Sequence, residues 1–342
     1  DVTPLKATLT SATIATTSGS PTCTVTKAAH GLAVGDIVQL DSVTLPGGTG
    51  FTNADFEDKN FQVISVPTTG TFTINQASNA SGTVSTGGSL SIKPYEPVGP
   101  RAQTYGYGWG MDPWSNGNWG EAAAASDVTL EPGLWSLDNF GEVLVATILN
   151  GKTFTWDSGI SQRLTTRAST TTNNFATTNN PTKTRVTLIS PTTRHLIHLG
   201  TETIVGTPDS QDDMFIRFSD QEDINTYSPS AINTAGTQRL QDGTKIIGAI
   251  KAKEVILIWT DNALYTMKFI GSPFTFAVEQ VGTNCGLIGQ NAVIEIDGAA
   301  FWLSPKGFFL YDGTVKSLPC TVEDFVFDNF DTTKGQQVSA GL

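Results

Sequence analysis

The sequence predicts an all-β protein, and three observations support that prediction. Only 15% of its 342 residues are charged, whereas about 25% is usual for soluble proteins. Thr, Ser, Asn and Gly are abundant instead, and they suit strands and tight turns because β-branched side chains favour the pleated surface and Gly and Asn tolerate positive φ. A hairpin pattern also recurs, with an apolar strand, a polar turn and an aromatic-ended strand at 255–265 and again at 299–313.

The recurring hairpin indicates the blades of a β-propeller. Trp259 and Trp302 occupy equivalent places in the two copies, about one blade period of roughly 40 to 50 residues apart. Looser copies occur at 142–156 and 194–218. We therefore expect 134–342 to form the blades of a complete or partial propeller. Apolar strands such as 255–258 would form the blade cores, with Trp259, Trp302 and Tyr311 packed between them.

Residues 1–97 predict a separate small β-barrel module. Short alternating segments between residues 8 and 74 are separated by turns that contain Gly and Pro, as in small barrels. The His-Gly-Leu phrase at 30–32, Gly35-Asp36, and the Phe-x-Val and Phe-Thr-Ile phrases within 61–74 resemble the module first named in ubiquitin-activating enzymes. That module is often inserted in bacteriophage structural proteins, and the resemblance implies no ubiquitin chemistry.

A connector at 98–133 combines aromatic rings with glycine. Such a segment has little backbone preference of its own, so its rings need a surface to cover. We expect them to pack on a neighbouring sheet or subunit, and the alternative is a sugar-binding or base-stacking platform. The candidate packing and interface aromatics are Tyr105, Tyr107, Trp109, Trp114 and Trp119.

From residue 134 onward, several ordered phrases resemble the tail nozzle or DNA-stabilisation proteins (tail tubular protein B-like) of short-tailed bacteriophages. The phrases occupy 134–142, 190–195, 217–223, 233–236, 259–261, 263–266, 282–288 and 312–313. The resemblance implies a homo-oligomer, expected to be a hexameric ring, that surrounds the DNA ejection conduit below the portal and the tail adaptor. Tail fibres or spikes are further expected partners. The protein would be made in the bacterial host cytoplasm and reside in the virion tail. Such proteins are usually longer, so we expect the sequence to be a segment of a larger product.

The net charge of the protein indicates how it would interact with DNA. With 20 basic and 32 acidic residues the net charge is −12, which argues against a surface that grips nucleic acid. Genomic DNA would instead pass without specific binding, and the alternative is that the acidity only keeps the protein soluble. Asp220, Glu222 and Asp223 are candidate channel-lining acids, or else an exposed turn after the strand at 214–218. No apolar run is long enough to span a membrane, so we expect no insertion by this chain.

The residues and motifs of the sequence predict no catalytic, cofactor-binding or metal site, and hence no enzyme. The Gly-rich stretch 282–289 lacks the Lys-Ser/Thr of a phosphate loop. Cys285 with His195 or His198 has no nucleophile signature and is interpreted as a packed free thiol, and the two histidines, three residues apart, are poor metal ligands together. The acidic runs 55–58 and 209–213 lack the spacing of a calcium loop.

The segment Ser136-Leu-Asp-Asn-Phe-Gly141 approaches a turn of sialidase-type propellers but has one residue too many. The sequence therefore predicts a nozzle or tail-tube subunit of a phage. The alternatives are a receptor- or carbohydrate-binding tail protein and, beyond it, a polysaccharide-cleaving propeller enzyme.

Overall fold

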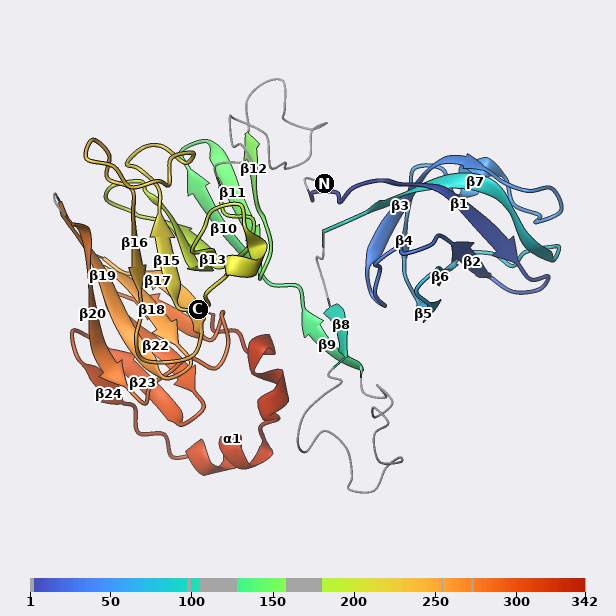
Figure 1. Ribbon diagram of the computed structural model, residues 1–342. Helices are drawn as coiled ribbons and strands as arrows, with labels where there is room; N and C mark the ends of the chain where they lie inside the picture. Colours follow the sequence, from blue (N-terminus) through green and yellow to red (C-terminus); the bar gives the residue numbers. More distant parts are fainter. Residues whose placement is uncertain are drawn as a thin grey trace, which may run out of the picture. The chain divides into compact units, whose positions relative to one another are not determined.

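The protein is almost entirely β-structure, as the composition predicted. The computed structural model describes residues 3–96, 100–104, 128–157, 180–253, 255–271 and 274–341. The chain divides into two compact units, Thr3–Gly133 and Leu134–Leu342. Figure 1 shows a curled sheet in the first unit and a succession of small sheets in the second. The predicted all-β class, with a barrel-like module and a partial propeller, is confirmed.

The first unit contains a seven-stranded antiparallel sheet in the order β4-β3-β7-β1-β2-β6-β5. Its alternating strands bury one face, because successive side chains point to opposite sides. The buried side chains include Ile14, Val25, Leu40, Phe72 and Ile92, which form one cluster. The strands are β1 (Leu9–Thr16), β2 (Thr22–Thr26), β3 (Ile37–Thr44), β4 (Lys59–Gln62), β5 (Ser65–Thr68), β6 (Thr71–Asn75) and β7 (Val84–Pro94).

A two-stranded antiparallel ribbon follows the curled sheet. It pairs β8 (Pro100–Thr104) with β9 (Val128–Pro132). The five predicted aromatics of the connector fall between these strands, and all five lie outside the described residues.

Among its described residues, the second unit contains four antiparallel sheets, named here blades 1 to 4, in which strand order follows chain order. In the part of the chain that the structure describes, blade 1 has three strands and the other blades have four. The strands of blades 1 and 2 are β10 (Trp135–Phe140), β11 (Val143–Ile148), β12 (Thr153–Asp157), β13 (Thr184–Ile189), β14 (Leu196–Thr201), β15 (Phe215–Phe218) and β16 (Gly236–Arg239). Those of blades 3 and 4 are β17 (Ile246–Lys251), β18 (Ile256–Thr260), β19 (Ala263–Gly271), β20 (Thr275–Thr283), β21 (Val293–Ile296), β22 (Ala299–Ser304), β23 (Gly307–Tyr311) and β24 (Val315–Ser317).

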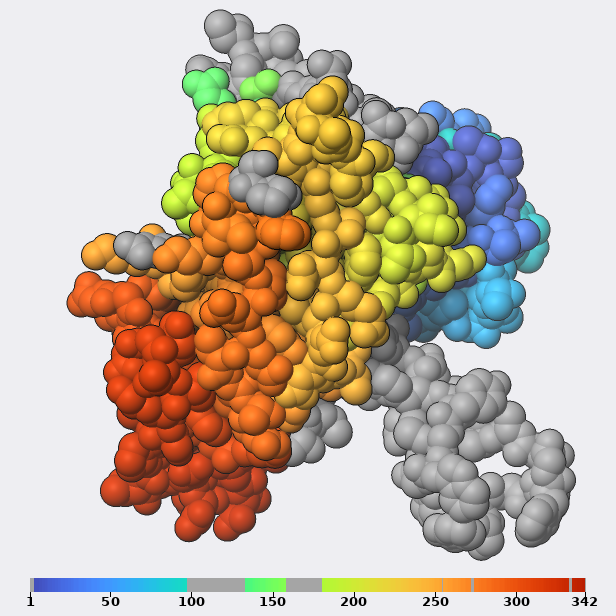
Figure 2. All heavy atoms as spheres, turned by 60° about the vertical axis from the view of Figure 1, so that its left-hand side comes forward, coloured from blue at the N-terminus to red at the C-terminus, as the bar shows by residue number. Residues whose placement is uncertain are grey.

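The recurring hairpin of the sequence forms the second and third strands of blades 3 and 4. Trp259 on β18 and Trp302 on β22 are buried, and their rings meet edge to face at 5.3 Å between centroids. The indole N–H of Trp302 donates to the Cys285 carbonyl at 2.8 Å. All five residues of β18 are buried, because neighbouring blades cover both of its faces. Figure 2 shows blades 3 and 4, coloured gold to red, forming one continuous surface on the face in view.

The C-terminal segment packs against blade 4. Helix α1 (Glu323–Asn329) places Phe327 against Phe308 of β23, with 6.1 Å between ring centroids. Farther on, the Ala340 N–H donates to the Asn291 carbonyl at 2.8 Å, and Ser339 bridges Asn291 in parallel orientation. Among the described residues, no helix combines the length and apolar character needed to cross a membrane.

Candidate functional site

The three predicted channel-lining acids lie in and beside a tight turn after β15. Asp220 Oδ1 accepts hydrogen bonds from the backbone N–H and the hydroxyl of Thr234, at 2.8 and 2.6 Å. Burial opposes ionisation of this carboxyl, but the hydrogen bonds outweigh it and hold its pKa below the usual value. Asp223 Oδ2 accepts from the Thr226 hydroxyl at 2.7 Å. Two of the three carboxylates therefore stabilise the turn itself.

Glu222 differs from its two neighbours. Its backbone has a φ of 59°, a conformation that non-glycine residues adopt uncommonly. Its carboxylate forms a 3.0 Å ion pair with Arg194, and both side chains are about half exposed. The Arg194 guanidinium also lies 4.6 Å from the centroid of the Phe140 ring. That these acids line a DNA channel stays a prediction.

His195 and His198 are buried structural side chains. His195 contacts the hydroxyls of Thr193 and Thr234 through its two ring nitrogens, at 2.7 and 3.0 Å. His198 Nε2 lies 3.0 Å from the Tyr227 hydroxyl. Burial lowers the pKa of His195 to about 4 and that of His198 to about 3. Both rings are therefore neutral at pH 7 and occupied by hydroxyl partners.

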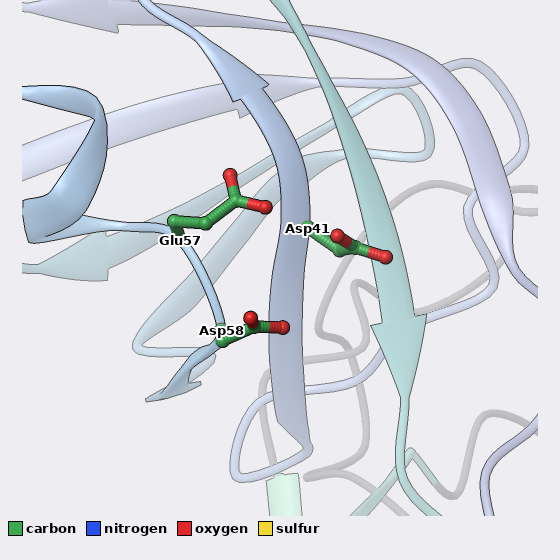
Figure 3. Close-up of side chains that lie close together, drawn as sticks. All are labelled: Asp41, Glu57 and Asp58. Atoms are coloured by element: carbon green, nitrogen blue, oxygen red, sulfur yellow. The ribbon is translucent and has the colours of Figure 1, made fainter.

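Three carboxylates of the first unit lie close together in space. They are not the same set as the acidic run 55–58 that the sequence offered for calcium. Figure 3 shows Asp41, Glu57 and Asp58 close together, with one oxygen of each within 4.8 Å of the others. Glu57 accepts from the backbone N–H groups of Ser42 and Val43, at 2.9 and 2.7 Å, so both of its oxygens are occupied.

The other acids nearby are also engaged. Asp41 is ion-paired with Lys93, which lowers the pKa of its carboxyl. Asp55, which the sequence grouped with Glu57 and Asp58, instead bonds Thr52 in a capping box. These carboxylates stabilise the turn and strand pairing around β3, and no metal site is assigned to them.

One cavity of the blades lies where their first strands approach one another. It measures about 520 Å³ and is named here the axial cavity. Its walls come from β10, β13 and β17 and from the two residues that lead toward β21. Its lining residues are Trp135, Ser136, Leu137, Asp138, Val186, Thr187, Leu188, Ala249, Ile250, Lys251, Gln290 and Asn291.

Asp138 connects three blades at this cavity. From β10 of blade 1, its Oδ2 accepts the backbone N–H of Ile189 in blade 2 at 2.7 Å. The same carboxylate pairs with Lys251 of blade 3, with Nζ–O distances of 2.5 and 2.6 Å. The carboxylate is 15% exposed and the Lys251 side chain is 37% exposed. Both side chains line the cavity, and the carboxylate is the more buried of the two.

Gln290, which precedes the first strand of blade 4, connects that blade to blade 1 through a hydrogen bond. Its amide nitrogen donates to Ser136 Oγ at 3.0 Å, across 154 residues of sequence. Its Oε1 is buried and has no hydrogen-bond partner among the described residues. An amide has donors on one side and an acceptor on the other, so one polar atom stays unsatisfied whichever way the group is turned.

The sequence did not identify this cavity. The sequence of 136–141 indicated only an imperfect sialidase-type turn, whereas Ser136 and Asp138 lie on the inner strand of blade 1. The partners of Asp138 in blades 2 and 3 are 51 and 113 residues away. Alternation along β10 was the available signal, because it places Ser136 and Asp138 on one face.

A second cavity of about 580 Å³ lies beside Arg217 in blade 2. Arg217 is 5% exposed, and its guanidinium donates to the carbonyls of Thr203, Glu202 and Tyr227 at 2.8 to 3.3 Å. Backbone groups thus occupy most of its donors. The axial cavity, where several blades contribute side chains, is the better candidate for a ligand.

The chain has a weak similarity to a solved structure from a phage. No family model matches the chain, and no curated protein matches it. The solved structure of the phage phi92 endosialidase is 16% identical with a TM-score of 0.25, and the match covers 89% of this chain and 48% of that one. The chain thus corresponds to about half the length of that protein.

This comparison corrects one prediction. The sequence analysis excluded an enzyme, and the matched protein is named an endosialidase. The exclusion was therefore wrong, and we withdraw it. The TM-score and the identity are too low to carry a catalytic residue or a substrate over to this chain.

Proposed function

We propose that the chain is a structural component of a bacteriophage tail. The observation that carries the proposal is the architecture: a curled seven-stranded barrel-like sheet accompanies four consecutive meander blades. Most of the sequence phrases that resemble tail proteins fall at strand ends and turns of those blades, and 134–142 spans the whole of β10. One example is 217–223, which ends β15 and forms the turn around Asp220. The resemblance thus concerns the framework of the blades.

Within the tail, we propose that the blades contact carbohydrate on the host surface. The axial cavity supports this role, because it joins an indole, an ion pair and amide groups at the convergence of several blades. Small-ligand sites commonly combine a concave surface with a few convergent polar groups. Whether any bound glycan is also cleaved is a question for assay, since glycosidases require two suitably placed carboxylates.

The second proposal is the nozzle role, with six copies around the DNA conduit and the adaptor above them. The net charge of −12 supports it, because an acidic wall repels phosphates and keeps DNA mobile. In this arrangement Asp220, Glu222 and Asp223 would face the bore, and substituting Lys for all three should slow DNA ejection from assembled particles. Unchanged ejection kinetics would remove these acids from the channel wall.

The deciding experiment is cryo-EM reconstruction of the purified virion. Density for this chain at a peripheral appendage would support host recognition, and a sixfold ring continuous with a DNA-wide bore would support the nozzle. Absence of the chain from the particle would overturn the tail assignment. Incubation of the protein with host capsule or cell-wall polysaccharide, followed by measurement of new reducing ends, would detect cleavage in either case.

A further inference from the structure

We propose that the axial cavity binds a neutral saccharide of one or two sugar units. The inference rests on the carbohydrate-contacting role proposed above and assigns that role to particular residues. The cavity volume of about 520 Å³ lies within the range of roughly 300 to 1,000 Å³ typical of small-ligand sites.

The charges at the cavity favour a neutral ligand. Asp138 and Lys251 neutralise each other through two short contacts, and the carboxylate also accepts the Ile189 N–H. An anionic ligand would have to compete with Asp138 for the ammonium group, and a cationic ligand would have to compete with Lys251 for the carboxylate. An uncharged ligand can hydrogen-bond to the pair without breaking it.

The polar groups favour a ligand rich in hydroxyls. Lys251 offers donors, Asn291 offers both donors and an acceptor, and Gln290 carries an acceptor without a partner. β10, β13 and β17 each stand at the end of their sheet, so alternate backbone N–H and C=O groups on the cavity side have no neighbouring strand in that sheet. A hydroxyl both donates and accepts, so it can satisfy either kind of group.

An apolar surface completes the site. Trp135 lines the cavity, and its ring is held against Phe154 of β12 at 6.0 Å between centroids. Leu137, 65% exposed on the same strand, adds aliphatic surface. Alternation along β10 places Trp135 and Leu137 on the opposite face from Ser136 and Asp138. A sugar ring at the edge of this strand can present a C–H face to the apolar side chains and its hydroxyls to the polar ones.

The test begins with a glycan array that carries neutral and sialylated glycans, probed with the full chain. Calorimetric titration of the methyl glycosides of glucose, galactose and N-acetylglucosamine, and of sialyllactose, then follows. We expect binding of at least one neutral sugar and weaker or absent binding of sialyllactose.

Substitutions then test whether binding takes place in the axial cavity. Trp135→Leu and Asn291→Ala leave the Asp138–Lys251 pair intact, and each should weaken binding at least tenfold. Phe274→Leu, at an exposed hairpin tip, and Asn329→Ala, on helix α1, serve as matched controls and should leave affinity unchanged. An unaltered thermal unfolding midpoint for Asn291→Ala would show that the loss is not caused by unfolding.

Three results would overturn the inference. They are no binding of any neutral sugar at millimolar concentration, equal affinity for the cavity variants and their controls, and preference for the sialylated ligand. Each is separate from the tail assignment. A chain found in the virion tail that binds no sugar would remove this inference alone, whereas a sugar-binding chain absent from the virion would remove the tail assignment alone.

Discussion

Replacing Asp138 with alanine should destabilise the blade unit strongly, because this one carboxylate connects three blades. The change leaves the Ile189 N–H without its acceptor, which costs about 1–3 kcal/mol when the donor is buried. It also removes the ion pair with Lys251. At 15% and 37% side-chain exposure, that pair is partly screened and adds about 0.5–1 kcal/mol. We expect a total loss of about 1.5–4 kcal/mol in the free energy of unfolding.

Urea denaturation followed by tryptophan fluorescence suits this measurement. All seven tryptophans lie beyond residue 97, so the signal omits the curled sheet of the first unit. Asp312→Ala is a matched control, because Asp312 also pairs with a lysine at 2.5 Å, but with side-chain exposures of 42% and 54%. This exposed pair is screened by water, so the control should cost clearly less than Asp138→Ala.

An asparagine variant separates the two contributions. Asp138→Asn can still accept the Ile189 N–H but cannot form the ion pair, so it should recover more than half of the stability lost in Asp138→Ala. The reasoning fails if Asp138→Ala is no more destabilising than Asp312→Ala. Equal losses in the alanine and asparagine variants would show that the ion pair, rather than the backbone hydrogen bond, dominates.

Three further outcomes are expected. Burial gives His195 and His198 native pKa values of about 4 and about 3, against about 6.5 in the unfolded chain. Above about pH 6.5 both histidines are neutral in either state, so they do not lower the free energy of unfolding. Between about pH 6.5 and each native pKa, the free energy of unfolding should fall by about 1.4 kcal/mol per pH unit per histidine. A pH series of urea midpoints measures the slope, and His195→Asn should remove the contribution of one histidine. Trp259→Ala should cost about 3–5 kcal/mol in the same assay, since the ring is fully buried; a loss below about 1 kcal/mol would contradict the described packing. Gly286→Ala should also destabilise, by about 1–3 kcal/mol or more, because the added Cβ would lie 2.1 Å from the Asp261 carbonyl oxygen; an unchanged thermal midpoint would refute this close approach.

Local sequence patterns predicted the strands better than they predicted the cavity. Composition and the repeated hairpin were sufficient to predict β18–β19 and β22–β23, because period-two alternation and turn chemistry act over a few residues. The environment of Asp138 depends on partners 51 and 113 residues away, which no local pattern specifies. Likewise, Asp41 lies beside Glu57 and Asp58 because β3 and β4 pair, whereas the sequence grouped those two acids with Asp55.

In blades 1 to 3 the first strand lines the axial cavity, and the later strands follow it in chain order. The hairpin between β19 and β20, with Ile270 53% and Phe274 74% exposed, therefore belongs to the outer part of blade 3. Insertions in such a hairpin lengthen the periphery without altering the register of β10, β13 or β17. One chain can thus diversify its outer loops while the geometry around Asp138 is inherited unchanged.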